Sequence, residues 1–215
     1  MIHKLIFLST SLSISSMATA QQATDKKPTD AKEHPVFVLP ETAKTKAEKI
    51  ISAARWQIGK TTTYDGSYVS MKYPKGDIPL EKGVCTDVVI RALRSSLNID
   101  LQEKVHVDMV KNFSKYPKIW GLKRTDKNID HRRVPNLRKY FSRMGYSIPV
   151  SKDKANFKAG DIITCTVAGR LPHIAIVSDK VNEQGVPYII HNIGLGTKED
   201  DSLFTYPMTG HYRIK

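Results

Sequence analysis

Three short β-branched runs in the last third of the chain constrain its fold more than any other feature. They read AGDIITCTVAG, LPHIAIVSD and VPYIIHNIG, and turns that contain glycine separate them. Short runs of this composition, closed by glycine or proline turns, are typical of neighbouring strands in an antiparallel sheet. The sequence therefore predicts an antiparallel β-meander in the C-terminal part of the chain.

The segments before these runs have a helical period instead. Apolar residues recur at three- and four-residue steps from Ala47 to Ile58, and the same period follows Cys85. Shorter patterns predict further helices over residues 105–113 and 135–144. Because the helices come first and the strands follow, we expect an α+β fold in which N-terminal helices pack on a C-terminal antiparallel β-sheet.

The chain divides into three parts by composition. Residues 1–20 read as a signal peptide, with a basic start, an apolar stretch and an A-x-A cleavage site that ends at Ala20. Residues 21–41 are polar and broken by prolines, which is typical of a flexible leader. Residues 42–215 then form one domain, and no segment after the signal is apolar over the ~20 residues that a membrane span needs. We expect an exported protein, periplasmic or secreted.

The formal net charge of +13 favours anionic partners. Export makes nucleic acid a poor candidate, so peptidoglycan or another anionic polymer of the cell envelope fits better. The alternative is that a lysine-rich surface serves solubility alone. We expect the protein to act as a monomer.

Cys85, in the stretch EKGVCTDVVIRAL, is a candidate nucleophile. It lies where a helix should begin, and the unpaired N–H groups of a helix N-terminus stabilise a thiolate. Two alternatives are a disulfide with Cys165, which export would permit, and simple packing. Cys165 lies inside a β-branched run and is expected to pack.

A cysteine nucleophile needs an imidazole as base and a third polar group to orient that imidazole. His173 opens the second β-branched run, and His191 lies in the third. Because side chains alternate along a strand, only one of His191 and Asn192 can face the site. An amide could orient the base as well as a histidine, so both remain candidates for the third group.

The order of four segments resembles the NlpC/P60 superfamily of cysteine peptidases, which act on peptidoglycan stem peptides. These segments are AEKIISAARWQIGKTTTYD, GVCTDVVIRALRSSLNIDL, AGDIITCTVAGRLPHIAIVSD and YIIHNIG. More narrowly, NIDHRRVPNLRKYF and EDDSLFTYPMTGHYRI resemble its uncharacterised branch DUF1287. The resemblance runs from Ala47 to Arg213 and implies an NlpC/P60, papain-like fold.

The resemblance also implies roles for single residues. Cys85 corresponds to the nucleophile, His173 to the base and His191 to the third group, while Tyr64 matches a tyrosine beside the nucleophile. The usual Asp-Cys-Ser-Gly is replaced here by Val-Cys-Thr-Asp, so Asp87 stands where the family's nucleophile neighbours contact substrate.

A dense polar cluster precedes the last predicted helix and offers further candidates for substrate binding. Arginine pairs with carboxylates through two parallel hydrogen bonds, which would suit acidic stem peptides. A solvated cluster without a function is the alternative. The candidates are Asp130, His131, Arg132 and Arg133, together with His211 and Arg213 near the C-terminus.

These observations predict an exported cysteine hydrolase that cleaves an amide bond of peptidoglycan without a cofactor. N-acetylmuramoyl amide hydrolysis or acyl transfer by the same residues is one alternative, and a wall-binding module without catalysis is another. Zinc on Cys85, His173 and His191 is disfavoured because the chain lacks the closely spaced ligand pairs of most zinc sites. We therefore expect no metal.

Overall fold

The computed structural model describes residues 37–215, so the predicted signal peptide and most of the predicted leader lie outside the described residues. Its main helices are α1 (Lys46–Arg55), α2 (Cys85–Leu97), α3 (Leu101–Asn112) and α4 (Val134–Arg143), with short 3-10 turns η1 (Phe113–Lys115), η2 (Asp130–Arg132) and η3 (Lys154–Asn156). Its strands are β1 (Thr63–Tyr64), β2 (Lys82–Gly83), β3 (Ser147–Ile148), β4 (Ile162–Val167), β5 (Leu171–Val181), β6 (Pro187–Asn192), β7 (Thr197–Asp200) and β8 (Met208–Tyr212).

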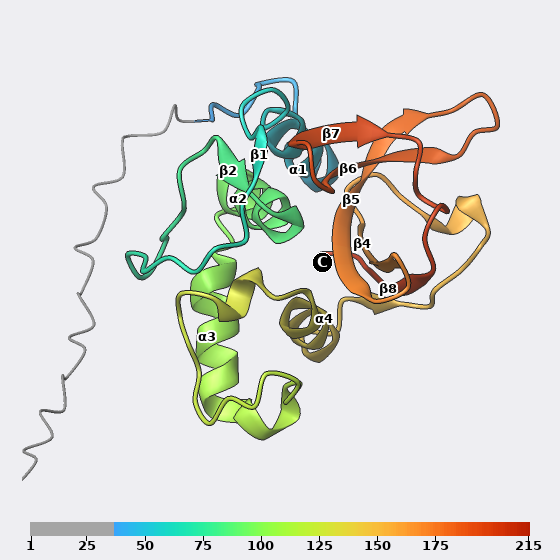
Figure 1. Ribbon diagram of the computed structural model, residues 1–215. Coiled ribbons are helices and arrows are strands. Elements are labelled where there is room, and N and C mark those ends of the chain that lie inside the picture. Colours follow the sequence, from blue (N-terminus) through green and yellow to red (C-terminus); the bar gives the residue numbers. More distant parts are fainter. Residues whose placement is uncertain (1–36) are drawn as a thin grey trace, which may run out of the picture.

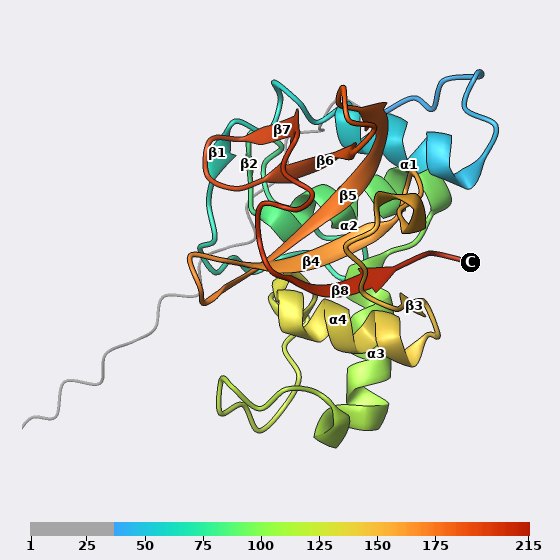
Figure 2. The same ribbon diagram turned by 90° about the vertical axis from the view of Figure 1, so that its right-hand side faces the viewer.

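Six of the strands form one antiparallel sheet in the order β3-β8-β4-β5-β6-β7. The three predicted runs are β4, β5 and β6, and they pair in sequence as a meander. Helices α2 and α4 lie against one face of this sheet in both ribbon views (Figures 1 and 2). The predicted α+β class, with helices on an antiparallel sheet, is confirmed.

Side-chain alternation gives the sheet two apolar faces. Ile174, Ile176 and Ile190 belong to the main core against the helices. The alternate residues Val177 and Ile189 belong to a smaller cluster on the other face. That second face is covered by side chains from the connections, among them Phe157 and Leu203.

Helix α2 is the buried element between α1 and the sheet. Its β-branched run Val88-Val89-Ile90 is at most 2% exposed, so apolar burial outweighs the low helix propensity of these residues. The helix begins where Val84 is extended and the Asp87 carboxylate accepts a 2.7 Å hydrogen bond from the Val84 N–H. It ends at Asn98, which adopts the left-handed conformation with φ of 54°.

Helix α1 begins directly after Thr45, which caps it, and ends at Arg55, before Ile58, the last residue of the apolar pattern. The Thr45 hydroxyl accepts from the Glu48 N–H at 3.2 Å, and the Glu48 carboxylate accepts from the Thr45 N–H at 2.8 Å. Ahead of it, Phe37 packs edge-to-face on Trp56 with ring centroids 5.8 Å apart. Part of the segment that we assigned to the leader therefore packs on the domain.

The long connection between α1 and α2 has almost no regular structure, and two arginines of α2 hold it. Arg91 donates to the Asp77 carboxylate at 3.0 Å and to the carbonyls of Ile78 and Lys82. Arg94 donates to the carbonyl of Gly76 at 3.1 Å. This connection therefore has a fixed position next to the start of α2.

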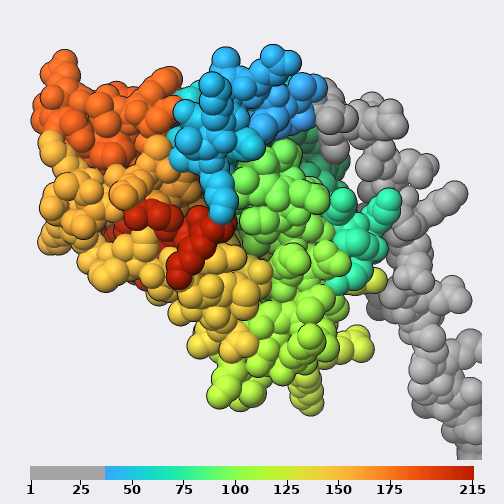
Figure 3. All heavy atoms as spheres, turned by 180° about the vertical axis from the view of Figure 1, so that it is seen from behind, coloured from blue at the N-terminus to red at the C-terminus, as the bar shows by residue number. Residues whose placement is uncertain are grey.

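The C-terminal residues lie on the side opposite to the view of Figure 1. Seen from behind, the red C-terminal segment lies between the blue region around α1 and the yellow segment that follows α4 (Figure 3). Ile214 packs there against the main core. None of the helices over residues 37–215 has the length and apolar character of a membrane span.

Candidate active site

Cys85 is the first residue of α2, and its side chain is buried. Its sulfur accepts hydrogen bonds from the backbone N–H groups of Ile174 in β5 and Thr86 in α2. Burial raises the pKa of the thiol to about 12, an effect larger than the opposing effect of these N–H groups. The thiol is therefore protonated at neutral pH.

His173 and His191 lie side by side on neighbouring strands. His173 Nε2 is 2.8 Å from His191 Nδ1, and the two rings meet edge to face at an interplanar angle of 71°. Burial lowers the pKa of His173 to about 3, with the neighbouring His191 as the next cause, and burial also lowers the pKa of His191. Both rings are therefore neutral at pH 7.

Asp200 of β7 lies next to His191 on the side away from His173. The sequence did not indicate a role for it. Its Oδ1 lies 3.2 Å from His191 Nε2, within ion-pair distance, although the pair lacks the alignment of a hydrogen bond. Lys198 and Ser202 hold the carboxylate in place. With the His191 Nε2–H facing Asp200, Nδ1 of His191 is the acceptor, so His173 donates from Nε2 and keeps a free lone pair on Nδ1.

The thiol lies next to the peptide unit that joins His173 to Ile174. The N–H that donates to the Cys85 sulfur belongs to Ile174, the residue directly after His173. Alternation turns His173 and His191 toward the sheet face that carries Ile189, whereas Ile174 points to the helices. No hydrogen bond joins the sulfur to either imidazole within residues 37–215.

Tyr64, at the end of β1, lies beside the thiol. Its hydroxyl makes a hydrogen bond with the Cys85 side chain. Burial and the neighbouring Cys85 together raise the pKa of Tyr64 to about 12, so the phenol stays protonated. With 45% of its surface exposed, Tyr64 can contact both the thiol and a bound ligand.

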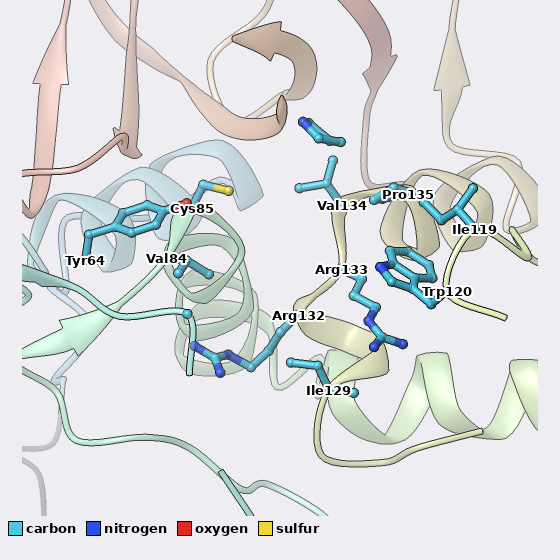
Figure 4. A pocket seen from close by; sticks show the side chains of 12 residues that line it. Tyr64, Val84, Cys85, Ile119, Trp120, Ile129, Arg132, Arg133, Val134 and Pro135 are labelled. Carbon is cyan, nitrogen blue, oxygen red and sulfur yellow. The ribbon is translucent and has the colours of Figure 1, made fainter. Parts of the chain in front are cut away.

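A pocket of about 390 Å³ opens next to Cys85. Figure 4 shows Cys85 and Tyr64 on one side of it, and Trp120 and Arg133 on the other. The remaining walls are largely apolar: Gly66, Val84, Ile119, Ile129, Val134, Pro135 and Pro172, with Arg132 alongside. A larger hollow of about 690 Å³ near Phe204 and Tyr206 has no cysteine or histidine in its lining.

Asp87 and Arg132, both expected as substrate-binding or orienting residues, form an ion pair with each other. Arg132 donates from Nε and Nη2 to the two carboxylate oxygens of Asp87, both at 3.0 Å. It also donates to the carbonyls of Asp65 and Ser67 at 3.0 Å each. The pair therefore fixes the start of α2 and the segment just after β1, and no guanidinium nitrogen of Arg132 is without a protein partner.

The other members of the polar cluster differ in where they point. Asp130 and His131, which the sequence offered as substrate-binding candidates, are 1% and 2% exposed, and neither lines the pocket. Asp130 instead accepts from the Asp126 N–H and from Arg133. Arg133 does line the pocket, and its guanidinium lies 4.3 Å from the centre of the Trp120 ring.

Three further candidates have structural partners instead of a place at the pocket. His211 and Arg213 both pair with the buried Asp161, at 2.7 Å and 2.6 Å, and neither lines the pocket. Asn192 faces the helices, where its amide donates to the Gly83 carbonyl at 3.0 Å and accepts from the Gly194 N–H. His191, and not Asn192, is the residue that contacts His173.

Both cysteines are free thiols in this structure. Cys165 is buried in β4 directly across from His173, and burial raises the pKa of its thiol to about 11. Over residues 37–215, no three histidine, cysteine, aspartate or glutamate side chains are grouped as metal ligands would be.

The fold and this site define a small α+β protein with a buried cysteine at a helix start and a pair of contacting histidines on the neighbouring sheet. Residues 51–214 match the family described as "Domain of unknown function (DUF1287)", and the chain belongs to that family. The Uncharacterized protein YijF of Escherichia coli (strain K12) is 54% identical over 164 residues, which are 76% of this chain and 80% of that protein.

Among solved structures, the chain is similar to NlpC1 from Trichomonas vaginalis. The two share 14% sequence identity with a TM-score of 0.41. The match covers 84% of this chain and 48% of NlpC1, so this chain spans about half of the length of that protein.

Proposed function

We propose that this protein is a cysteine hydrolase that cleaves an amide bond in peptidoglycan stem peptides, with Cys85 as nucleophile, His173 as base and His191 as the residue that orients the base. One observation carries the proposal: His173 is hydrogen-bonded to His191 through Nε2, which leaves its Nδ1 available as a base. His173 also directly precedes Ile174, whose N–H donates to the Cys85 sulfur. The order of motifs that resembles NlpC/P60 peptidases supports the choice of substrate.

The first half of the reaction forms a thioester. His173 Nδ1 takes the proton of the Cys85 thiol, and the sulfur attacks the carbonyl carbon of the substrate amide. Since this transfer creates a cation and an anion side by side, their attraction offsets part of the cost of charging two buried groups. His191 accepts from the His173 Nε2–H and stabilises the imidazolium, and Asp200 stabilises His191 in turn.

The tetrahedral intermediate needs donors for its oxyanion. The N–H of Cys85 has no hydrogen-bond partner in the part of the chain that the structure describes, and it lies at the N-terminus of α2. The Tyr64 hydroxyl next to the sulfur is the second donor. Collapse of the intermediate breaks the C–N bond, and His173 returns its proton to the leaving amine.

Water completes the reaction. It attacks the thioester carbonyl while His173 accepts one of its protons, and the products are a free carboxylic acid and the regenerated Cys85 thiol. The proposed steps use side chains and one backbone N–H of this chain, together with one water molecule. The predicted signal peptide and the net charge of +13 fit a protein that is exported and binds an anionic wall polymer as a monomer.

The proposal is tested by incubating the mature protein with purified sacculi and identifying released fragments by mass spectrometry. We expect new pairs of amine and carboxyl termini, which name the bond that is cut and separate stem-peptide cleavage from muramoyl amide cleavage. Cys85→Ala should abolish the products. His191→Ala should lower kcat by about 10²- to 10⁴-fold, the range for lost acid–base assistance, with KM little changed.

Cys165→Ala is the matched control, because it removes the other buried thiol and should leave product formation largely intact. If the wild-type protein leaves sacculi uncut but still sediments with them, the hydrolase proposal is wrong. A binding module without catalysis then takes its place.

A further inference from the structure

The pocket next to Cys85 is lined by positively charged but not by negatively charged side chains. Its lining contains two arginines and no aspartate or glutamate. The nitrogens of Arg132 all donate to protein oxygens, so Arg132 has little capacity left for a ligand. Arg133 is therefore the cation that remains for a bound molecule.

Arg133 is held in place by protein contacts, and some of its N–H donors stay available for a ligand. Its Nη1 donates to Asp130 at 3.2 Å, and its guanidinium lies 4.3 Å from the centre of the Trp120 ring. Nε and Nη2 have no hydrogen-bond partner within residues 37–215. Only 18% of the side chain is exposed, so solvent screens these donors less than it would on an open surface.

Resting on the proposed function, we infer that Arg133 and Trp120 form a subsite for a peptide carboxylate. The carboxylate would accept from Nε and Nη2 of Arg133, while aliphatic parts of the same peptide lie on Ile119, Val134 and Pro172. Figure 4 shows this subsite across the pocket from Cys85, so the peptide extends from the carboxylate to the reacting carbonyl. The substrate is thus an acidic peptide with a free carboxylate near the bond that is cut.

The experiment compares peptides that differ in one group. The parent is the stem tetrapeptide L-Ala-D-Glu-diaminopimelate-D-Ala, and each free carboxylate is replaced in turn by a carboxamide. For one of these replacements, kcat/KM of the wild-type protein should fall at least about tenfold, which corresponds to about 1.4 kcal/mol. The other amidated peptides should be cleaved about as fast as the parent.

Arg133→Gln should lower kcat/KM for the parent to the level of that one amidated peptide, and leave the amidated peptide itself unaffected. Arg133→Lys should recover part of the preference, since lysine keeps the charge but not the two parallel donors. Arg124→Gln is the matched control, because it also removes one positive charge from the connection between α3 and α4. Arg124 is exposed and does not line the pocket. It should keep the full preference.

Cleavage of all peptides at similar rates by the wild-type protein overturns the inference and leaves the hydrolase proposal standing. If nothing is cleaved, the hydrolase proposal fails, and calorimetric binding of the same peptides decides the subsite alone. Wild-type protein should then bind the parent more tightly than one amidated peptide, and Arg133→Gln should remove that difference. Equal binding in the two proteins overturns the inference.

Discussion

Buried neutral histidines make the stability of this protein depend on pH. His131, His173 and His191 are at most 4% exposed, and burial lowers the pKa of each. For His131 and His173 the folded value is about 3, against an ordinary value of 6.5. These histidines therefore bind protons less readily in the folded chain than in the unfolded chain.

Stability should fall as pH decreases below about 6.5. In that range the unfolded state binds more protons than the folded state, so the free energy of unfolding decreases by up to about 1.4 kcal/mol per pH unit for each such histidine. We expect His131→Gln to weaken the decrease between pH 7 and pH 5 by about 2 kcal/mol in urea unfolding. Carboxylate contributions cancel in the comparison with wild type, and identical pH profiles would contradict the assignment of His131.

At this scale, the sequence identified candidate side chains but not the contacts that hold them in place. Cys85, His173 and His191 were predictable because their residue types and their places at a helix start and on strands are local features. Asp200 was not, since its short strand β7 had no predicted pattern and only the register against Ile189 brings it to His191. Arg132 looked free because its buried partner Asp87 lies 45 residues earlier in the chain.

Among the elements, the start of α2 depends on a salt bridge that the sequence did not reveal. Asp87 caps this helix, and Arg132 of η2 pairs with Asp87, with side chains that are 4% and 2% exposed. Arg132 also reaches the backbone of the segment after Tyr64. The position of Cys85 is therefore coupled to an element that follows α3.

Removing one partner of this pair should be costly. Arg132→Met leaves the Asp87 carboxylate buried and unpaired, and we expect a loss of about 3–5 kcal/mol in the free energy of unfolding. The double variant Asp87→Leu/Arg132→Met should lose clearly less than the sum of the single variants in a urea cycle.

Lys82→Met is the matched control, since the pair of Lys82 with Asp65 is 45% and 24% exposed. Its loss should stay below about 1 kcal/mol. A similarly small loss for Arg132→Met would show that the buried pair contributes little to the start of α2.

The elements themselves were largely predictable, and their bounds less so. The helices and the three-stranded meander follow from apolar periodicity, which depends on a residue and its near neighbours. Strands β3 and β8 were missed because their residues pair with strands far away in the sequence, and β-structure is decided by such contacts. Strand β7 pairs with the preceding strand β6, but its residues TKED are not a β-branched run. The connection between α1 and α2 was read as a loop, but its attachment to Arg91 and Arg94 was not visible.

At the scale of the whole molecule, positive charge should govern binding to anionic wall material. The bound fraction in co-sedimentation with sacculi should fall between 50 and 500 mM salt, because salt screens exposed charges. Lys118→Glu/Lys123→Glu/Arg124→Glu changes exposed residues of the connection that carries Trp120. This variant should bind more weakly at 50 mM salt.

The triple variant Lys152→Glu/Lys154→Glu/Lys158→Glu makes the same change in net charge at exposed positions away from this pocket. It should reduce binding less than the first variant. If both variants bind equally, total charge alone controls binding, and the region around the pocket has no special part in it.

The split of the site between helix and sheet has a consequence for the order in which the protein is made. A ribosome completes Cys85 on the order of 90 residues before His173, and His191 and Asp200 follow later still. Until β5, β6 and β7 have joined the sheet, the growing chain carries a thiol without its base. Any activity of the site would therefore begin only after nearly the whole chain has been synthesised and the sheet has formed.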